Sequence, residues 1–526
     1  MKIALAQLNY TIGDIDGNTS KIIDSINKAK AQRADLVIFA EQAVSGTPAF
    51  DLLRKTTFLE LCEDALVEIA SCCDGIAAIV GLPILTREGT ISAAALIQDR
   101  KVLRYVGKKY ITARREMGFL VPSKGFEYAT IKGHKCAIVV GDDLSREHDF
   151  DKSVETVISI NARKYGRGTM TYRYEMMRHL SFVEGKNLVL VNQVGGSTDI
   201  VYDGTSGAFN NRGELVLMMK HFEEDFQTFD TKAAGEPVSI PSTYNDRTRM
   251  VYQAARCGLR DFFVKNGYKK ACIGLSGGID SAVVACLAAD ALGRENIRAL
   301  LLPSQFSSDH SVEDAKKLAE NLGIEYNVIP ITEIYTSVVN TLKPVIGGRE
   351  FDATEENIQT RIRTVLLMAV QNKADYILLN SSNKSENALG LCTLYGDTAG
   401  AFSPTGDLYK SEMYDLARYI NRTQGDPIPG NILDKEPSSE LHPGQKDSDI
   451  LPPYEVVDAI LYRMIEEGQH REEIVNAGFD SEVVEKIHAM IMRNEKKRYQ
   501  FPPVLRLSMC SFGHERLMPL TNKYGD

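Results

Sequence analysis

Short apolar runs alternate with longer amphipathic stretches along the first half of the chain. Apolar runs bounded by turn residues predict buried strands, and apolar residues spaced three and four positions apart predict helices. Residues 203–213 are rich in glycine and small polar residues and predict a turn-rich return. This alternation indicates an α/β layered fold. The predicted strands are 2–8, 36–40, 76–82, 90–98, 102–106, 135–140 and 188–192, and the predicted helices are 18–32, 59–72 and 176–184.

The second half continues the alternation and predicts a doubly wound parallel sheet, in which ligands bind at the carboxyl ends of the strands. Between the halves, Pro and Ser interrupt the pattern, as is typical of a linker. We therefore expect a first domain over residues 1–234, a linker over 235–246 and a second domain over 247–526. The predicted strands of the second domain are 270–275, 299–302, 325–329 and 376–379, and its predicted helices are 246–266, 280–292, 311–322 and 357–374.

Composition narrows the classes of function. The chain has 526 residues, of which 44% are hydrophobic and 25% are charged, and its net charge is −9. That charge argues against nucleic acid or an anionic membrane surface as a partner, and no apolar run approaches the roughly 20 residues needed to span a bilayer. Nine scattered cysteines without C-x-x-C spacing, and a start that enters a strand without a signal-peptide profile, lead us to expect a cytoplasmic protein.

Residues 273–281, Ile-Gly-Leu-Ser-Gly-Gly-Ile-Asp-Ser, join a predicted strand to a predicted helix. Ser276, Gly277 and Gly278 form a turn with little side chain to obstruct an approaching group. Free backbone N–H groups at a helix start, supported by the helix dipole, suit a phosphate. No lysine follows the glycines, so the pattern differs from a Walker motif. The alternative interpretation is an ordinary glycine turn between a strand and a helix.

The segment 276–281 resembles the pyrophosphate loop of ATP pyrophosphatases, and further segments resemble NAD synthetases in the same order. The resemblance implies a fold of the adenine nucleotide alpha hydrolase type. It also implies a reaction in which ATP adenylates the carboxylate of deamido-NAD, diphosphate leaves, and ammonia then displaces AMP. The resembling segments are 303–308, 355–363, 383–386, 393–400, 407–410, 437–441, 445–449, 451–454 and 497–503.

The resemblance also implies roles for individual residues. Asp280, Glu386 and Lys410 are the expected catalytic residues, and Asp280 and Glu386 are the expected ligands of Mg²⁺. Taken without the resemblance, Arg361 and Arg363 are better explained as surface charges on a helix. The residues expected to bind ATP are Ser276, Gly277, Gly278, Asp280, Ser281, Arg363 and Lys410, and those expected to bind deamido-NAD are Asn357, Arg361, Tyr395 and Asp397.

The first half resembles the carbon–nitrogen hydrolase (nitrilase-like) domain, an αββα sandwich that works with a Glu base, a Lys and a Cys nucleophile. Glu41 matches the base, Lys108 the lysine and Glu116 a second glutamate of that family. The nucleophile motif differs, because Gly141 stands in the place of the cysteine. Cys136 lies upstream within a predicted strand, where we expect a structural thiol. The segment 161–165 also differs from the family's loop beside the nucleophile.

Without a thiolate no acyl-enzyme forms, so we expect the first domain to be inactive as an amidase. The leading hypothesis is an ammonia-dependent NAD synthetase with ATP and Mg²⁺ as cofactors. Alternatives are a glutamine-dependent enzyme supplied by a partner or an unrecognised glutaminase site, and an ATP-dependent ligase that amidates another carboxylate. A non-enzymatic regulator is a further alternative, against which the intact Asp280, Glu386 and Lys410 argue. The resemblance implies a homo-oligomer, a dimer of synthetase domains or larger.

Overall fold

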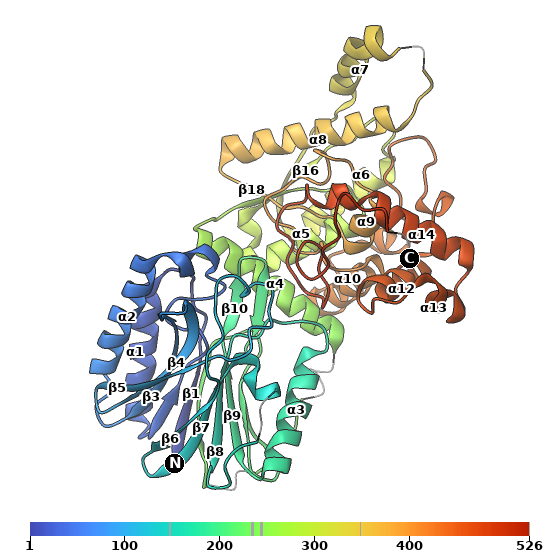
Figure 1. Ribbon diagram of the computed structural model, residues 1–526. Helices are drawn as coiled ribbons and strands as arrows, with labels where there is room; N and C mark the ends of the chain where they lie inside the picture. The colour runs from blue at the N-terminus through green and yellow to red at the C-terminus, as the bar shows by residue number, and fades with distance from the viewer. Residues whose placement is uncertain (147–148, 233–235, 242–245, 348, 525–526) are drawn as a thin grey trace. The chain divides into compact units, whose positions relative to one another are not determined.

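The computed structural model describes residues 1–146, 149–232, 236–241, 246–347 and 349–524. The chain divides into two compact units, Met1–Asn245 and Asp246–Asp526 (Figure 1). The expected linker, 235–246, lies partly outside the described residues, namely at 235 and 242–245.

The first unit contains two six-stranded sheets packed face to face. Helices α1 (Ile15–Ala31) and α2 (Thr56–Ser71) cover the outer face of the first sheet, and α3 (Thr169–Glu184) covers the second (Figure 1). This is the expected αββα sandwich. The first sheet has the order β14 (Asp225–Asp230), β1 (Lys2–Gln7), β2 (Leu36–Ile38), β3 (Ala77–Leu85), β4 (Thr90–Gln98) and β5 (Lys101–Gly107). The second has the order β13 (Leu215–Met218), β12 (Gly207–Phe209), β9 (Asn187–Asn192), β8 (Thr156–Asn161), β7 (His134–Val140) and β6 (Glu127–Ile131). A separate ribbon pairs β10 (Val194–Ser197) with β11 (Ile200–Asp203).

The middle layers explain why the strands in this unit are apolar on both sides. Every residue of β3 except Leu85 is buried, and so is every residue of β4 except Gln98. One face of these strands meets a helix layer and the other meets the second sheet, so strict alternation of polar and apolar residues is not required. One continuous hydrophobic core results.

The second unit is built on a parallel sheet with the order β17 (Glu325–Val328), β16 (Ile297–Leu301), β15 (Ala271–Gly274) and β18 (Ile377–Leu378). Helices α5 (Ile279–Leu292) and α6 (Asp309–Leu322) connect β15 to β16 and β16 to β17, so the chain moves outward on one side of β15. Helices α7 (Thr332–Ile346) and α8 (Ala353–Ala374) then connect β17 to β18, which lies on the other side of β15. Right-handed crossovers then place the two pairs on opposite faces. The doubly wound sheet is thus confirmed.

Helix α5 has no polar face because α4 (Arg247–Asn266) and α10 (Lys410–Gln424) cover its side away from the sheet. Four helices contribute residues to a separate apolar cluster, namely α9 (Lys384–Leu389), α12 (Tyr454–Ile465), α13 (Arg471–Asn476) and α14 (Ser481–Arg493). The short helix α11 (Gly430–Asp434) follows α10, and α15 (Glu495–Arg498) follows α14.

Several predicted boundaries were wrong, for identifiable reasons. Helices α1 and α8 begin three or four residues before the predicted starts, at 15 and 353, because Asp14 and Asp352 cap their first N–H groups. Residues 203–213, predicted as turns, contain β12, which pairs with β9 and β13. The segment 161–165, treated as a loop, starts with the last residue of β8. Within the described parts of the chain, no helix combines the length and apolarity needed to cross a membrane.

Candidate functional site

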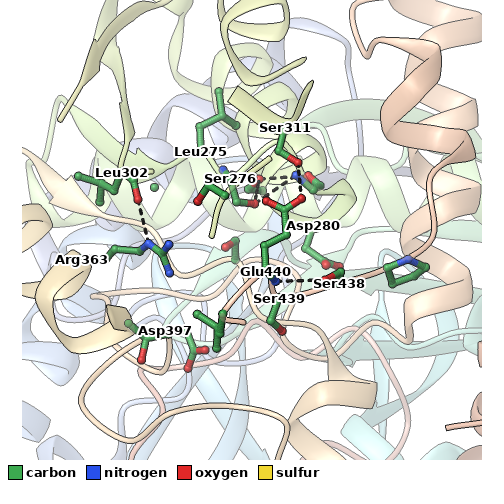
Figure 2. A pocket seen from close by; sticks show the side chains of 18 of the residues that line it. Leu275, Ser276, Asp280, Leu302, Ser311, Arg363, Asp397, Ser438, Ser439 and Glu440 are labelled. Carbon is green, nitrogen blue, oxygen red and sulfur yellow. Dashed lines mark hydrogen bonds between the residues drawn. The ribbon is translucent and has the colours of Figure 1, made fainter. Parts of the chain in front are cut away.

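A cavity of about 630 Å³ opens in the second unit where β15, β16 and β18 end. Its lining includes Ser276, Asp280 and Arg363, together with residues of the segment 435–447 (Figure 2). The carboxyl ends of parallel strands are the expected place for a ligand in this fold.

The glycine turn between β15 and α5 is held by its two serines. Ser276 Oγ lies 3.0 Å from Ser281 Oγ and accepts the Gly278 N–H at 3.1 Å. Gly277 has φ +77°, and a Cβ there would lie 2.2 Å from the carbonyl oxygen of Ser311. Only glycine therefore fits this position, where the turn contacts the start of α6.

Three charged side chains from different helices meet beside this turn. Lys410 Nζ lies 2.5 Å from Asp280 Oδ2 and 3.5 Å from Glu386 Oε1. Asn383 donates from Nδ2 to Asp280 Oδ1 at 3.0 Å, and its own Oδ1 accepts the Glu386 N–H at 2.9 Å. Asn383 therefore connects the Asp280 carboxylate to the backbone of Glu386, a role that the sequence motif alone did not assign.

The charges of Asp280, Glu386 and Lys410 affect one another's ionisation. Burial and the neighbouring Asp280 carboxylate raise the pKa of Glu386 to about 8, although Lys410 opposes the shift. Burial alone would lower the pKa of Lys410, but the two carboxylates hold it above its ordinary value. Across the described ranges, no three side chains of the His, Cys, Asp or Glu type gather closely enough to hold a metal ion by themselves. A cation at Asp280 and Glu386 would thus need further ligands from a nucleotide or water.

Some predicted residues line the cavity and others do not. Arg363 lines it and donates from Nε to the Leu302 carbonyl oxygen at 2.9 Å, and Asp397 also lines it (Figure 2). Gly278, Asp280, Ser281, Glu386 and Lys410 line it as well.

Gly277 packs against Ser311 instead of lining the cavity. Asn357, Arg361 and Tyr395 also lie outside its lining. Asn357 Oδ1 accepts from Thr393 Oγ1 at 2.6 Å, and Arg361 Nε donates to the Leu394 carbonyl oxygen at 3.1 Å. Tyr395 is 68% exposed. These contacts tie α8 to the segment 393–397, which contributes Gly396 and Asp397 to the cavity lining.

Sequence reasoning assigned no role to Glu440. Its Oε1 accepts from Ser311 Oγ at 2.8 Å (Figure 2). The same oxygen accepts from Ser308 Oγ at 2.7 Å. Lys435 Nζ donates to Ser311 Oγ at 3.0 Å. The segment 435–447 is thereby attached to the start of α6. In the sequence, the resembling segments at 437–441 and 445–449 were the signals for this part of the chain.

A second buried cluster lies in the first unit. Lys108 is 3% exposed, and its Nζ lies 3.2 Å from Glu41 Oε1 and 2.8 Å from Glu116 Oε2. Ser92 Oγ donates to Glu41 Oε1 at 2.8 Å. Burial lowers the pKa of Lys108, but the two glutamates more than reverse that effect and raise it. The expected glutamate base, lysine and second glutamate are therefore neighbours.

Gly141 lies beside this cluster at the end of β7, with φ +61°. A Cβ at this position would lie 2.8 Å from Lys108 Nζ and 3.0 Å from Glu41 Oε2. Cys136 is fully buried within β7, and burial raises the pKa of its thiol to about 12. The cluster thus holds no nucleophile at the position where the resemblance expects one.

Known proteins resemble the second unit by itself and the chain over almost its whole length. The family described as NAD synthase matches residues 251–501. A glutamine-dependent NAD(+) synthetase of Acinetobacter baylyi is 37% identical over 99% of this chain and 98% of its own, and one of Aquifex aeolicus is 37% identical over 100% of both.

Two solved structures resemble this chain over almost its whole length. The glutamine-dependent NAD+ synthetase of Acinetobacter baumannii, in complex with ADP, has a TM-score of 0.79 at 35% identity over 99% of this chain and 98% of that one. The enzyme of Cytophaga hutchinsonii has a TM-score of 0.87 at 19% identity over the same shares, and supports the fold alone. The chain belongs to the family of two-domain NAD synthetases.

Proposed function

We propose that the second unit catalyses the ATP-dependent amidation of deamido-NAD through an adenylated intermediate. The observation that carries the proposal is the meeting of Asp280, Glu386 and Lys410 beside the glycine turn, in a cavity at the strand ends. The carboxylate oxygen of deamido-NAD attacks the α-phosphorus of ATP, and diphosphate leaves. Ammonia then attacks the acyl carbon, and AMP leaves.

The side chains have separable tasks in this proposal. The N–H groups of the turn and the Lys410 ammonium neutralise charge that develops on the departing diphosphate. Arg363 contacts the nucleotide from the opposite wall. Asp280 and Glu386 suit Mg²⁺, which prefers one or two carboxylates together with phosphate oxygens. Bound there, Mg²⁺ would supply additional positive charge to the phosphates.

The source of nitrogen needs a correction to the sequence-based hypothesis. The names of the relatives favour glutamine over the free ammonia that we expected. The amidase cluster of this chain nevertheless has Gly141 where the nucleophile is expected. We therefore propose that glutamine serves as the nitrogen source only after a separate glutaminase has released ammonia. A nucleophile elsewhere in the chain is the competing explanation, and the release of glutamate by the purified chain distinguishes the two.

The test measures NAD formation by the purified chain with ammonium, with glutamine, and with glutamine plus an added glutaminase. We expect turnover in the first and third reactions only. Release of glutamate in step with NAD in the second reaction would show that the chain carries its own glutaminase. No NAD in any reaction, with AMP formed from another carboxylate, would favour the alternative ligase.

Two further expectations remain proposals. We propose a homo-oligomer, which light scattering of the purified chain tests. We also propose a cytoplasmic location, which is consistent with nine free cysteines and is tested by cell fractionation.

A further inference from the structure

A buried carboxylate on α12 connects the two helices that carry Glu386 and Lys410. Asp458 is 5% exposed. Its Oδ1 accepts from Ser385 Oγ at 2.5 Å, and its Oδ2 accepts the backbone N–H of Ser411 at 2.8 Å. Ser385 Oγ in turn accepts the backbone N–H of Lys410 at 2.9 Å. One carboxylate thereby joins the start of α10 to α9.

The connection through Asp458 stabilises the start of α10, where Lys410 lies. Lys410 is the first residue of α10, where backbone N–H groups have no partner inside the helix. The helix dipole also disfavours a cation at this end. Ser385 and Asp458 accept two of the N–H groups, and the charge of Asp458 offsets the dipole. A lysine is therefore stabilised at an otherwise unfavourable place.

Asp458 is not explained by packing. It lies on the buried side of α12 with Val457, Leu461 and Ile465, where an apolar side chain would avoid the cost of burying an acid. Burial raises the pKa of Asp458 to about 6. The hydrogen bonds that Asp458 accepts from the starts of both helices explain why an acid is present in this apolar surrounding.

We infer that Asp458 is a positioning residue for adenylation: through Ser385 and the first turn of α10, it holds the Lys410 ammonium at the phosphate site. Ser385 directly precedes Glu386, so the same contact sets the spacing of Glu386 and Lys410, whose charged atoms lie 3.5 Å apart. This role rests on the proposed function of Lys410 toward ATP.

A double-mutant cycle tests the inference without turnover. Calorimetry gives the affinity of the full chain for α,β-methylene-ATP with Mg²⁺, in the wild type, Asp458→Asn, Lys410→Met and the double variant. We expect Asp458→Asn to weaken binding about tenfold, as the loss of charge-assisted hydrogen bonds would. In the Lys410→Met background the same change should cost less than about twofold, because coupled residues are not additive. Affinity for deamido-NAD should stay unchanged in Asp458→Asn.

Two further variants separate positioning from general stability. Ser385→Ala removes the hydroxyl that links Asp458 to the backbone N–H of Lys410, and it should reproduce the loss of affinity. This variant can therefore replace Asp458→Asn in the test if that variant does not fold. Asp261→Asn on α4 removes another carboxylate that is 3% exposed and pairs with Arg260 at 2.9 Å, and should bind the analogue like the wild type.

Additive losses in the cycle would overturn the inference, and so would a lower melting temperature of Asp458→Asn at unchanged affinity. A wild type that binds the analogue but makes no NAD would remove the proposed function while leaving this cycle interpretable.

Discussion

The ammonium of Lys108 occupies the space into which a side chain at position 141 would project. A Cβ on Gly141 would lie 2.7 Å from Lys108 Cε and 2.8 Å from Nζ, both shorter than van der Waals contact. The backbone at Gly141 is also left-handed, with φ +61°. The backbone conformation therefore favours glycine here, and any side chain at this position would have to displace the end of Lys108.

Replacing Gly141 with alanine should destabilise the fold by about 1–3 kcal/mol, because backbone strain and overpacking act together. Urea unfolding measures the change. Gly118→Ala is the matched control, since Gly118 has φ +83° but a Cβ there would meet nothing within 4 Å. The difference between the two variants isolates the contact with Lys108. Equal destabilisation would mean that Lys108 simply moves aside.

Gly141→Cys should not restore glutaminase activity. The new side chain competes with Lys108 for space, and Asp142 next to it is already engaged by Arg163 at 3.1 Å. Glutamate release should stay at the wild-type level. A thiol count with a chromogenic reagent in denaturant verifies that the cysteine is present. Glutamate release coupled to NAD in this variant would show that the single missing thiol was the whole defect.

Asp280→Ala and Glu386→Ala should each reduce diphosphate release by about a hundredfold or more, since losing a metal-bridged phosphate contact costs several kcal/mol in the barrier. Circular dichroism should show an intact fold. Asp290→Ala is the control on the same helix as Asp280, because Asp290 bonds Tyr252 and Arg256 and lies outside the cavity lining. Near-normal release from either cavity variant would remove that residue from the mechanism.

Lys410→Met should raise the KM for ATP by roughly tenfold or more while changing that for deamido-NAD much less, because the lysine acts as a point charge on phosphate. Steady-state kinetics with each substrate varied gives both values. Lys316→Met, which removes a surface partner of Glu313, should behave like the wild type. A similar loss for both substrates would point to a structural lysine that separates two carboxylates.

Asp407 should contribute stability that disappears in acid. Burial raises its pKa, but Lys384 at 2.9 Å and the N–H of Ser508 at 2.7 Å lower it to about 2, below the ordinary 3.8. The unfolded state therefore binds the proton more readily, so this contribution is complete above about pH 4 and is lost as the pH falls toward 2.

Asp407→Asn should unfold at lower urea, with a loss of about 3–5 kcal/mol, as expected when a buried pair is broken. Its stability should also fall less steeply than that of the wild type between about pH 4 and pH 3, because the group that titrates there is gone. If the free energy of unfolding falls with the same slope in both proteins below about pH 4, another carboxylate dominates the loss of stability in acid.

The sequence by itself determined the alternation of strands and helices, the glycine turn at 276–281 and the glycine at position 141. These features are local. A buried strand, a capped helix start or a turn is encoded by the few residues that form it, and a missing thiol is visible without any coordinates. Family resemblance then assigned the adenylation chemistry to the second half of the chain, and that assignment stays a prediction.

Only the tertiary structure decided which of the chosen residues meet. Asp280, Glu386 and Lys410 lie on α5, α9 and α10, and their contact depends on the order of the crossovers and on how these helices pack. Motif matching assigned Arg361 and Tyr395 to deamido-NAD, which stays a prediction, and only the tertiary structure showed that both lie outside the cavity lining, because one helix or loop turns its residues in several directions. Asp458 could have been noticed as an acid on an apolar stripe, but its partners, Ser385 and Ser411, come from two other helices. Side chains distant in sequence become neighbours through packing, and no local pattern records that.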